Sequence, residues 1–254
     1  MPHKIKHYGW IRDLPDHRDV LYSAPIAQLQ ALPTKVDLRP QCPPVYDQGQ
    51  LGSCTGNGIA GAFEFDEIKQ KLPHEFTPSR LFIYYNERVI EGTVDTDSGA
   101  QIRDGIKSVV KQGVCDEKDW PYDIAKFTKR PPATCFQNAE KHKVTSYQRL
   151  VQNLAQMKGC LASGYPFVFG FTVYDSFESD EVAKNGQVPM PAPSESVLGG
   201  HCVMAVGYDD AQSRFIIRNS WGTKWGMKGY CTMPYSYLSQ HDLSSDFWTI
   251  RLVH

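Results

Sequence analysis

Four polar residues of this chain have the types and the spacing that acyl transfer through a thiol requires. Cys54 stands at the start of an uncharged, apolar segment that is typical of a helix beginning, and a helix N-terminus stabilises both a thiolate and a developing oxyanion. Gln48, six residues upstream, has a side-chain amide that can donate to the same oxyanion. His201 can stabilise the thiolate and later protonate a leaving amine, and Asn219 can orient the imidazole ring.

Each of these residues also has an ordinary structural explanation when it is taken alone. A cysteine at a helix start is usually structural, a histidine before a strand usually packs in the core or meets solvent, and an asparagine at a strand end usually belongs to a turn. We favour catalysis because the thiol, the imidazole and the orienting amide occur together. Cys202 follows His201 and faces the other side of the strand, so we expect it in the core or in a disulfide.

The elements that must position these residues change character along the chain. Apolar residues recur at helical spacing in three segments of the first half, at 54–72, 77–92 and 100–112. After a proline-rich joint, one more helix is predicted at 150–163, and strands are predicted at 166–174, 202–208, 214–218, 229–233 and 247–253. Helices followed by an antiparallel sheet predict an α+β fold of two lobes, with the site in the cleft between them.

The predicted strands also explain how distant residues meet. His201 stands at the start of one strand and Asn219 at the end of the next strand. In adjacent antiparallel strands, the start of one lies beside the end of the other. We therefore expect His201 and Asn219 to touch each other and to face Cys54 across the cleft.

Residues 1–31 have the character of a separate leader before a body that spans 32–254. The leader is rich in charge and proline, carries aromatic residues, and is too irregular for one long helix; such a segment usually drapes over a folded body. We hypothesise that Trp10, Leu14 and Tyr22 anchor it in or beside the cleft, where it restricts access until it is displaced. The alternative is that the leader merely packs on one lobe.

Composition argues against several classes of partner. Charged residues make up 22% of the 254 residues and the formal net charge is −1, so no basic field favours nucleic acid or an anionic membrane. No apolar run reaches the roughly 20 residues that a membrane-spanning helix needs. We expect a monomer with no metal and no cofactor.

The seven cysteines form no C-x-x-C pair, which argues against a zinc ribbon or a thioredoxin-like motif. Two alternatives stay open: three disulfides beside a free nucleophile, or mostly reduced cysteines that pack as small apolar side chains. No signal peptide follows Met1. We expect an intracellular protein if Met1 is the natural start, and a secreted one if a signal was removed.

From about Lys35 to its end, the chain resembles the papain-like cysteine peptidases, the family of papain and the cathepsins. The motifs that carry the resemblance stand in the family's order: Val36-Asp37-Leu38-Arg39, Gln48 to Cys54, Asp97-Ser98-Gly99, Trp120-Pro121-Tyr122, Gly200-His201 and Asn219-Ser220-Trp221-Gly222. The resemblance implies a helical lobe at about 45–143 and a barrel-like antiparallel β lobe at about 144–254. It also implies a zymogen-like type with a short leader.

The resemblance further implies a role for each motif. Cys54 is the nucleophile, His201 its acid and base partner and Asn219 the residue that orients His201, while Gln48 and the Cys54 amide form the oxyanion hole. The residues implied in substrate binding or in shaping the cleft are Ser98, Gly99, Gly200 and Trp221. Ser98 and Gly99 would offer backbone groups to an extended peptide, a form of strand addition. The implied function is hydrolysis of peptide bonds in polypeptide substrates through a thioester.

Two departures from the family's pattern lie beside the implied site. Thr55 follows the nucleophile where the family usually has tryptophan, which implies a wider or more polar cleft wall. Gly200 precedes His201 where an acidic or amide residue is common. Two other functions remain as alternatives: a papain-fold binding protein without turnover, and a papain-fold acyltransferase or amide ligase.

Overall fold

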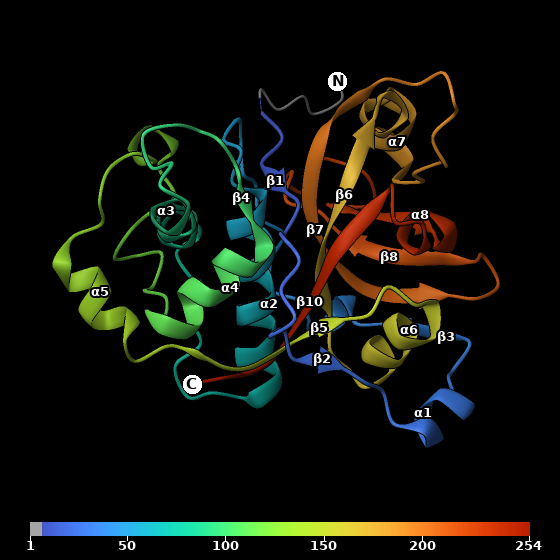
Figure 1. Cartoon of the computed structure of the whole chain (residues 1–254), viewed down its shortest axis with the longest axis horizontal. Helices are drawn as coiled ribbons and strands as arrows, with labels where there is room; N and C mark the ends of the chain where they lie inside the picture. Colours follow the sequence, from blue (N-terminus) through green and yellow to red (C-terminus); the bar gives the residue numbers. More distant parts are fainter. Residues whose placement is uncertain (1–6) are drawn as a thin grey trace.

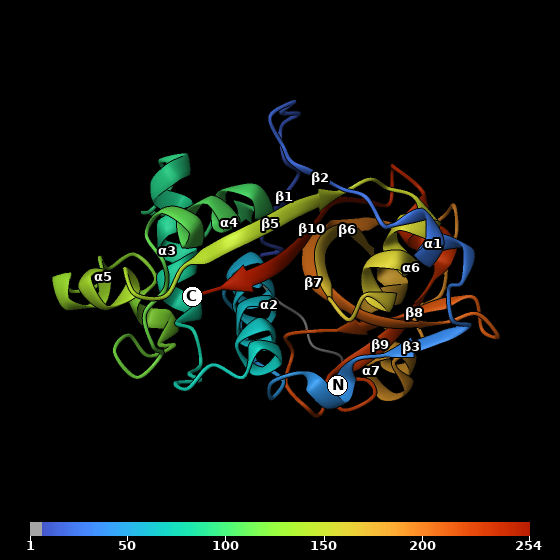
Figure 2. The same ribbon diagram turned by 90° about the horizontal axis from the view of Figure 1, so that it is seen from below.

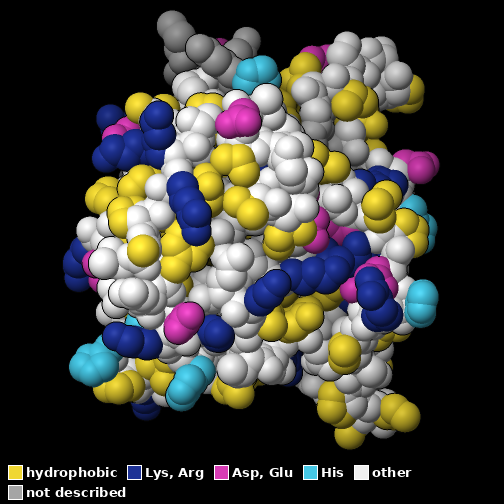
Figure 3. Space-filling view, turned by 60° about the vertical axis from the view of Figure 1, so that its left-hand side comes forward, with side chains coloured by type: hydrophobic (Ala, Val, Ile, Leu, Met, Phe, Trp, Pro, Cys, Tyr) yellow, Lys and Arg dark blue, Asp and Glu magenta, His cyan; other side chains and the backbone are white. Residues whose placement is uncertain are grey.

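The computed structural model describes residues 7–254, and within them no helix is long and apolar enough to cross a membrane. A helical lobe and a β lobe lie side by side, with the N-terminal segment running between them (Figure 1). On the face seen in Figure 3, Lys and Arg side chains are scattered among acidic, apolar and other groups rather than gathered into one field. The two-lobe α+β architecture is therefore as predicted.

The helical lobe contains the three predicted helices and one that was not predicted. Their bounds are α2 Cys54–Gln70, α3 Arg80–Glu91, α4 Ile102–Lys111 and α5 Ala133–Ala139. Helix α3 begins after Ser79 rather than at Thr77, because the Ser79 hydroxyl accepts a hydrogen bond from the backbone N–H of Phe82 (3.2 Å) and so caps the helix. The unpredicted α5 is short and follows the proline-rich joint.

Helix α2 forms the wall between the lobes. Residues Cys54 to Glu67 are all buried, and α2 contacts α3 on the helical side and β7 (Val197–Asp209) on the β side. A Cβ at Gly56 would lie 2.8 Å from the Arg80 carbonyl oxygen, and one at Gly58 would lie 3.1 Å from the Cys202 sulfur. The glycines in the first half of α2 therefore let both lobes approach the helix closely.

The β lobe is an eight-stranded sheet with the order β2-β5-β10-β6-β7-β8-β9, and β3 pairs with β7. The remaining bounds are β2 Leu21–Tyr22, β3 Lys35–Asp37, β5 Val144–Leu150, β6 Phe167–Tyr174, β8 Arg214–Arg218, β9 Tyr230–Pro234 and β10 Ser244–Val253. Figure 2 shows the strands curving around α6 (Leu154–Ala162), which contacts β7. The five strands predicted after residue 165 are all present.

One boundary differs clearly from the prediction. The helix expected from residue 150 begins only at Leu154, and Leu150 is the last residue of strand β5. The side-chain oxygen of Asn153 accepts hydrogen bonds from the backbone N–H groups of Ala155 (3.0 Å) and Gln156 (3.2 Å), which fixes the helix start. Strand β5 exists because it pairs with β10, a neighbour about a hundred residues away in sequence.

The leader touches both lobes. Strand β1 (Trp10–Ile11) pairs in parallel with β4 (Ala100–Gln101) of the helical lobe, and β2 pairs in parallel with β5 of the β lobe. Trp10 and Tyr22 are buried, as expected of anchors, but the side chain of Leu14 is 72% exposed. The expectation that Leu14 is an anchor was wrong: its backbone N–H donates to Gln101 (3.1 Å) while its side chain meets solvent.

All seven cysteines are free thiols in this structure. Cys42 is half-buried, and the other six are buried. Cys202 lies in the core, one residue after His201. The arrangement matches the alternative of reduced cysteines that pack as small apolar side chains.

Candidate active site

Cys54 begins helix α2 and is completely buried, with an exposed fraction of 0%. Burial raises the pKa of the Cys54 thiol to about 12, although backbone hydrogen bonds from Cys202 and Gly9 act in the opposite direction. The hydrogen bond from Cys202, the residue that follows His201, places the Cys54 sulfur against strand β7. The thiol is therefore protonated at neutral pH in this structure, and it lies where the two lobes meet.

His201 and Asn219 make the contact predicted from the strand order. Strands β7 and β8 are antiparallel, and His201 Nε2 lies 2.8 Å from Asn219 Oδ1. His201 is the fifth residue of β7 rather than its first, because the strand begins earlier than predicted, at Val197. Trp221 lies beside this pair, with its ring centre 5.1 Å from that of His201 and its plane tilted by 32°. The imidazole is thus held in one orientation inside an aromatic enclosure.

Gln48 is fixed by both lobes. Its side-chain nitrogen donates to the Leu51 carbonyl oxygen (3.0 Å), and its side-chain oxygen accepts from the Ser220 hydroxyl (2.6 Å). Because the amide nitrogen carries two protons, a second donor remains on the same side chain. Gln50, two residues later, is exposed, so Gln48 is the glutamine that lies beside the start of α2.

Thr55 does not form the cleft wall that its place in the sequence suggested. Its hydroxyl donates to Glu87 Oε2 (2.6 Å) in α3, and both residues are fully buried. Burial raises the pKa of Glu87 to about 8, in spite of this hydrogen bond. Thr55, the residue that departs from the family's pattern, is therefore hydrogen-bonded to a buried acid behind Cys54. Sequence reasoning missed Glu87 because it lies in the middle of a helix and belongs to no motif.

The leader crosses directly over Cys54 and His201. Gly9 lies against Gly52 and Gly99, and its carbonyl oxygen accepts a hydrogen bond from the Ala100 N–H (2.7 Å). The ring centre of Tyr8 is 6.0 Å from that of His201, and the Tyr8 hydroxyl donates to Glu178. His201, like Cys54, has an exposed fraction of 0%. Cys54 and His201 therefore both lie beneath the leader, without exposure to solvent.

The residues expected to bind substrate have different surroundings. Gly99 contacts Gly9 of the leader, and Gly200 contacts Trp10. Ser98 makes a local hydrogen bond from its hydroxyl to the Gly99 carbonyl (3.2 Å). The leader thus occupies the place where the sequence predicted an extended peptide.

A buried polar network holds the leader behind Trp10. Asp13 accepts hydrogen bonds from the Trp248 indole (2.9 Å) and from the Arg103 backbone N–H (3.1 Å). Asp19 forms ion pairs with Arg103 (2.7 Å) and Arg149 (2.8 Å). These contacts connect the leader to α4, β5 and β10 at once, and none of them was expected from the sequence, because their partners are distant along the chain.

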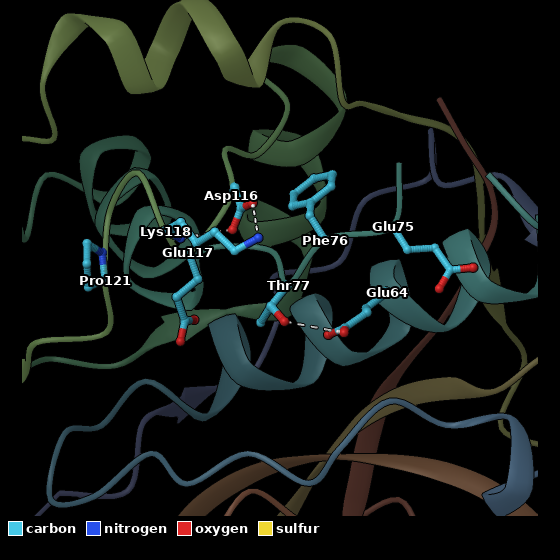
Figure 4. A pocket seen from close by; sticks show the side chains of 8 residues that line it. All are labelled: Glu64, Glu75, Phe76, Thr77, Asp116, Glu117, Lys118 and Pro121. Atoms are coloured by element: carbon cyan, nitrogen blue, oxygen red, sulfur yellow. Dashed lines mark hydrogen bonds and ion pairs between the residues drawn. The ribbon is translucent and has the colours of Figure 1, made fainter. Parts of the chain in front are cut away.

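A separate cavity in the helical lobe has no part in this site. It has a volume of about 560 Å³, and it is lined by Glu64, Glu75, Phe76, Thr77, Asp116, Glu117, Lys118 and Pro121 (Figure 4). Several of its polar groups are already paired: Thr77 with Glu64 (3.4 Å), Lys118 with Asp116 (3.6 Å), and Glu117 with Arg80 (2.6 Å). None of the residues predicted for catalysis or substrate binding lines it.

Comparison with known proteins agrees with the geometry of the fold. A solved structure of xylellain, a cysteine protease from Xylella fastidiosa, superposes with a TM-score of 0.93 at 46% identity, over 100% of this chain and 99% of that one. A procathepsin B of Trypanosoma congolense shares the fold, with a TM-score of 0.73 at 21% identity, over 89% of this chain and 79% of that one. An uncharacterized peptidase-like protein of Acanthamoeba polyphaga mimivirus is 43% identical over 98% of this chain and 88% of its own length.

The family model described as papain family cysteine protease matches residues 32–246, which is most of the chain. The matched region starts after the leader and includes Cys54, His201 and Asn219. The chain belongs to the papain family of cysteine proteases.

Proposed function

We propose that this protein is a cysteine peptidase that uses Cys54, His201, Asn219 and Gln48, and that its leader holds it in a closed form. The observation that carries the proposal is the His201–Asn219 hydrogen bond on strands that lie against the thiol at the start of α2. A thiol, an imidazole and an orienting amide are the three groups that this chemistry needs.

The reaction follows from these positions. His201 accepts the proton of the Cys54 thiol, and the thiolate attacks the carbonyl carbon of a peptide bond. The oxyanion receives hydrogen bonds from the free N–H of the Gln48 amide and from the Cys54 backbone N–H. His201 then gives its proton to the leaving amine. Water, deprotonated by His201, hydrolyses the resulting thioester and restores the thiol. Asn219 keeps the imidazole in the required orientation throughout.

The closed form accounts for two properties of the site. Cys54 and His201 are both fully buried under the leader, so a substrate carbonyl has no route to the sulfur. The same burial keeps the thiol protonated, with its pKa raised to about 12. Displacement of the leader would admit the substrate and water together, and it would remove the main cause of the raised pKa.

Labelling and turnover with the full chain test this function. A thiol-reactive epoxide should label Cys54 when the leader is displaced, and the same preparation should cleave a fluorogenic peptide into two products. Labelling without cleavage of any peptide would favour a binding protein instead. Transfer of the acyl group to an added amine in preference to water would favour a transferase or a ligase.

A further inference from the structure

The indole ring of Trp10 fills a space bounded by Gly170, Gly200 and Asp246, which we call the cradle. We propose that the cradle selects a large, neutral aromatic side chain of the substrate that carries a hydrogen-bond donor, such as tryptophan, and that Asp246 is the residue that determines this specificity. The proposal rests on the proposed peptidase function, because it describes which peptides the opened cleft accepts.

Two glycines create the space for the indole ring. A Cβ at Gly170 of β6 would lie 1.9 Å from the Trp10 ring, and one at Gly200 of β7 would lie 2.6 Å from it. Neither glycine has a positive φ, so their backbone conformations would allow other residues. The ring excludes a side chain at Gly170, and the ring together with the Trp10 carbonyl oxygen (2.6 Å) excludes one at Gly200. Because Gly200 directly precedes His201, the cradle adjoins the proposed catalytic imidazole.

Asp246 closes the far end of the cradle. Its Oδ2 accepts hydrogen bonds from the Trp10 indole N–H (3.2 Å) and from the Asp13 backbone N–H (2.8 Å), both of which belong to the leader. Its Oδ1 accepts from Arg149 of the body (3.2 Å). Asp246 is 2% exposed with the leader in place. When the leader leaves, Oδ2 loses two donors at once, and a substrate side chain that enters must replace one of them.

The charges around the cradle favour a neutral donor over a cation. Arg149 already pairs with Asp246 (3.2 Å), and Arg103 and Arg149 also both pair with Asp19 (2.7 and 2.8 Å). An arginine or lysine of the substrate would therefore meet a carboxylate that already has a cationic partner, with a second guanidinium group nearby. A glutamate would meet Asp246 at close range. An indole fills the space left by Trp10 and supplies the N–H without a charge.

The matched pair of tryptophan and phenylalanine isolates the role of the carboxyl group. Both rings are flat and apolar, but only tryptophan brings an N–H donor to Asp246 Oδ2. A phenylalanine would bury that oxygen without a partner, so we expect tryptophan to exceed phenylalanine in kcat/KM by about tenfold or more.

The test uses the full chain with Gly9→Ala and Trp10→Ala, which removes the leader from the cradle without shortening the protein. Quenched peptides with one position varied at a time around the scissile bond are compared by kcat/KM, with tryptophan, phenylalanine, leucine, arginine and glutamate in turn. We expect one position to prefer tryptophan, with arginine below it and glutamate lowest.

Two further substitutions in that background separate the carboxyl group from the cradle. Asp246 has φ +59°, a conformation that glycine and asparagine adopt readily. Asp246→Gly should bring the ratio of tryptophan to phenylalanine close to one, and Asp246→Asn should give an intermediate ratio. Gly170→Ala should lower cleavage of both aromatic peptides together and spare the peptide with leucine.

The outcomes distinguish this inference from the function on which it rests. If the opened chain cleaves no peptide, the peptidase function fails and the inference fails with it. If peptides are cleaved but tryptophan and phenylalanine are equal, arginine is preferred, or the ratio survives Asp246→Gly, the inference alone is overturned.

Discussion

The Cβ position of Gly9 points at the carbonyl oxygen of Gly52, 1.6 Å away, so the leader passes this point only as glycine. On the opposite side, a Cβ at Gly99 would lie 2.3 Å from the Gly9 carbonyl oxygen. The leader therefore runs through a narrow passage at this point, where Gly9 packs against Gly52 and Gly99. The passage lies over Cys54, because the Gly9 N–H donates to the sulfur.

A methyl group at Gly9 should open the enzyme. Overpacking of this kind costs about 1–3 kcal/mol, which corresponds to roughly a five- to 150-fold change in the ratio of open to closed chains. We expect Gly9→Ala to raise the rate of cleavage of a small fluorogenic peptide by a factor in that range. Leu14→Ala is the matched control in the leader, since that side chain is exposed. Equal activity of Gly9→Ala and the natural chain, with the fold intact, would contradict autoinhibition.

Removal of the nucleophile should abolish turnover and leave folding intact. In the Gly9→Ala background, we expect Cys54→Ala to lower kcat by at least roughly 10⁴-fold, because no other group can form the thioester. The melting temperature should stay within a few degrees, since only a small side chain changes. Peptide cleavage that survives this substitution would place the chemistry at another residue.

The reactivity of the thiol should report the position of the leader. In the closed form burial raises the pKa of Cys54 to about 12, so alkylation by iodoacetamide should be slow from pH 6 to 9 and should rise only above that range. We expect Gly9→Ala to shift the chain toward the open form, in which Cys54 is less buried and keeps the backbone donor of Cys202, so the rise should move to lower pH. Mass spectrometry identifies alkylated Cys54 among the seven cysteines. Identical pH profiles in the two chains would show that the leader does not set the pKa.

The buried carboxyl groups of Asp13 and Asp246, where the leader meets the body, lead us to expect that docking of the leader weakens as pH rises. Burial and the nearby charge of Asp246 raise the pKa of Asp13 from 3.8 to about 6, although Trp248 and Arg103 act in the opposite direction. When docking raises the pKa of an acid, the protonated acid favours docking. This contribution is complete at pH values below the pKa of the acid in the undocked leader, and it is lost as pH rises through the pKa of the acid in the docked leader. A cavity of about 550 Å³ lined by Asp13 and Asp246 gives solvent protons access to the pair.

The activity of the natural chain divided by that of Gly9→Ala isolates docking from the chemistry. We expect this ratio to increase between pH 4 and 7, and we expect Asp13→Asn, which imitates the protonated acid, to flatten the increase. Asp19 titrates at lower pH than Asp13. Burial alone would raise the pKa of Asp19, but the hydrogen bonds from Arg103 and Arg149 lower it. A ratio that falls as pH rises would contradict the assignment to Asp13.

The sequence predicted the parts of the fold and site that depend on local patterns. The helix that begins at Cys54 and the strands that carry His201 and Asn219 follow from periodicity, and their contact follows from strand order. Strand β5 was not predicted, and its last residue, Leu150, was assigned to the helix that follows, because the strand is stabilised by pairing with β10 rather than by its own residues. The periodicity of one segment does not predict which distant strand pairs with it.

The role of the leader was predictable only in outline. Aromatic residues in a charged, proline-rich segment indicated anchoring, and Trp10 is indeed buried. The cradle that receives Trp10 consists of Gly170, Gly200 and Asp246, which belong to three different strands. A glycine in a predicted strand does not indicate that an aromatic ring packs against it. Leu14 was misjudged for the same reason, since nothing in its own segment shows that only its backbone docks.

The pairing of β2 with β5 bears on how long the proposed open form would last. Leu21 and Tyr22 hold the leader to the β lobe beyond the cleft, so a leader that leaves Cys54 remains tethered a few residues away. A short tether of this kind keeps its end at an effective concentration on the order of millimolar. We therefore expect the cleft to close again once substrate departs, and each opening of an intact chain to be transient. His17 and Arg18 are exposed, and we expect a single cut of the chain there to free the segment that covers Cys54, so that it no longer returns to the cleft.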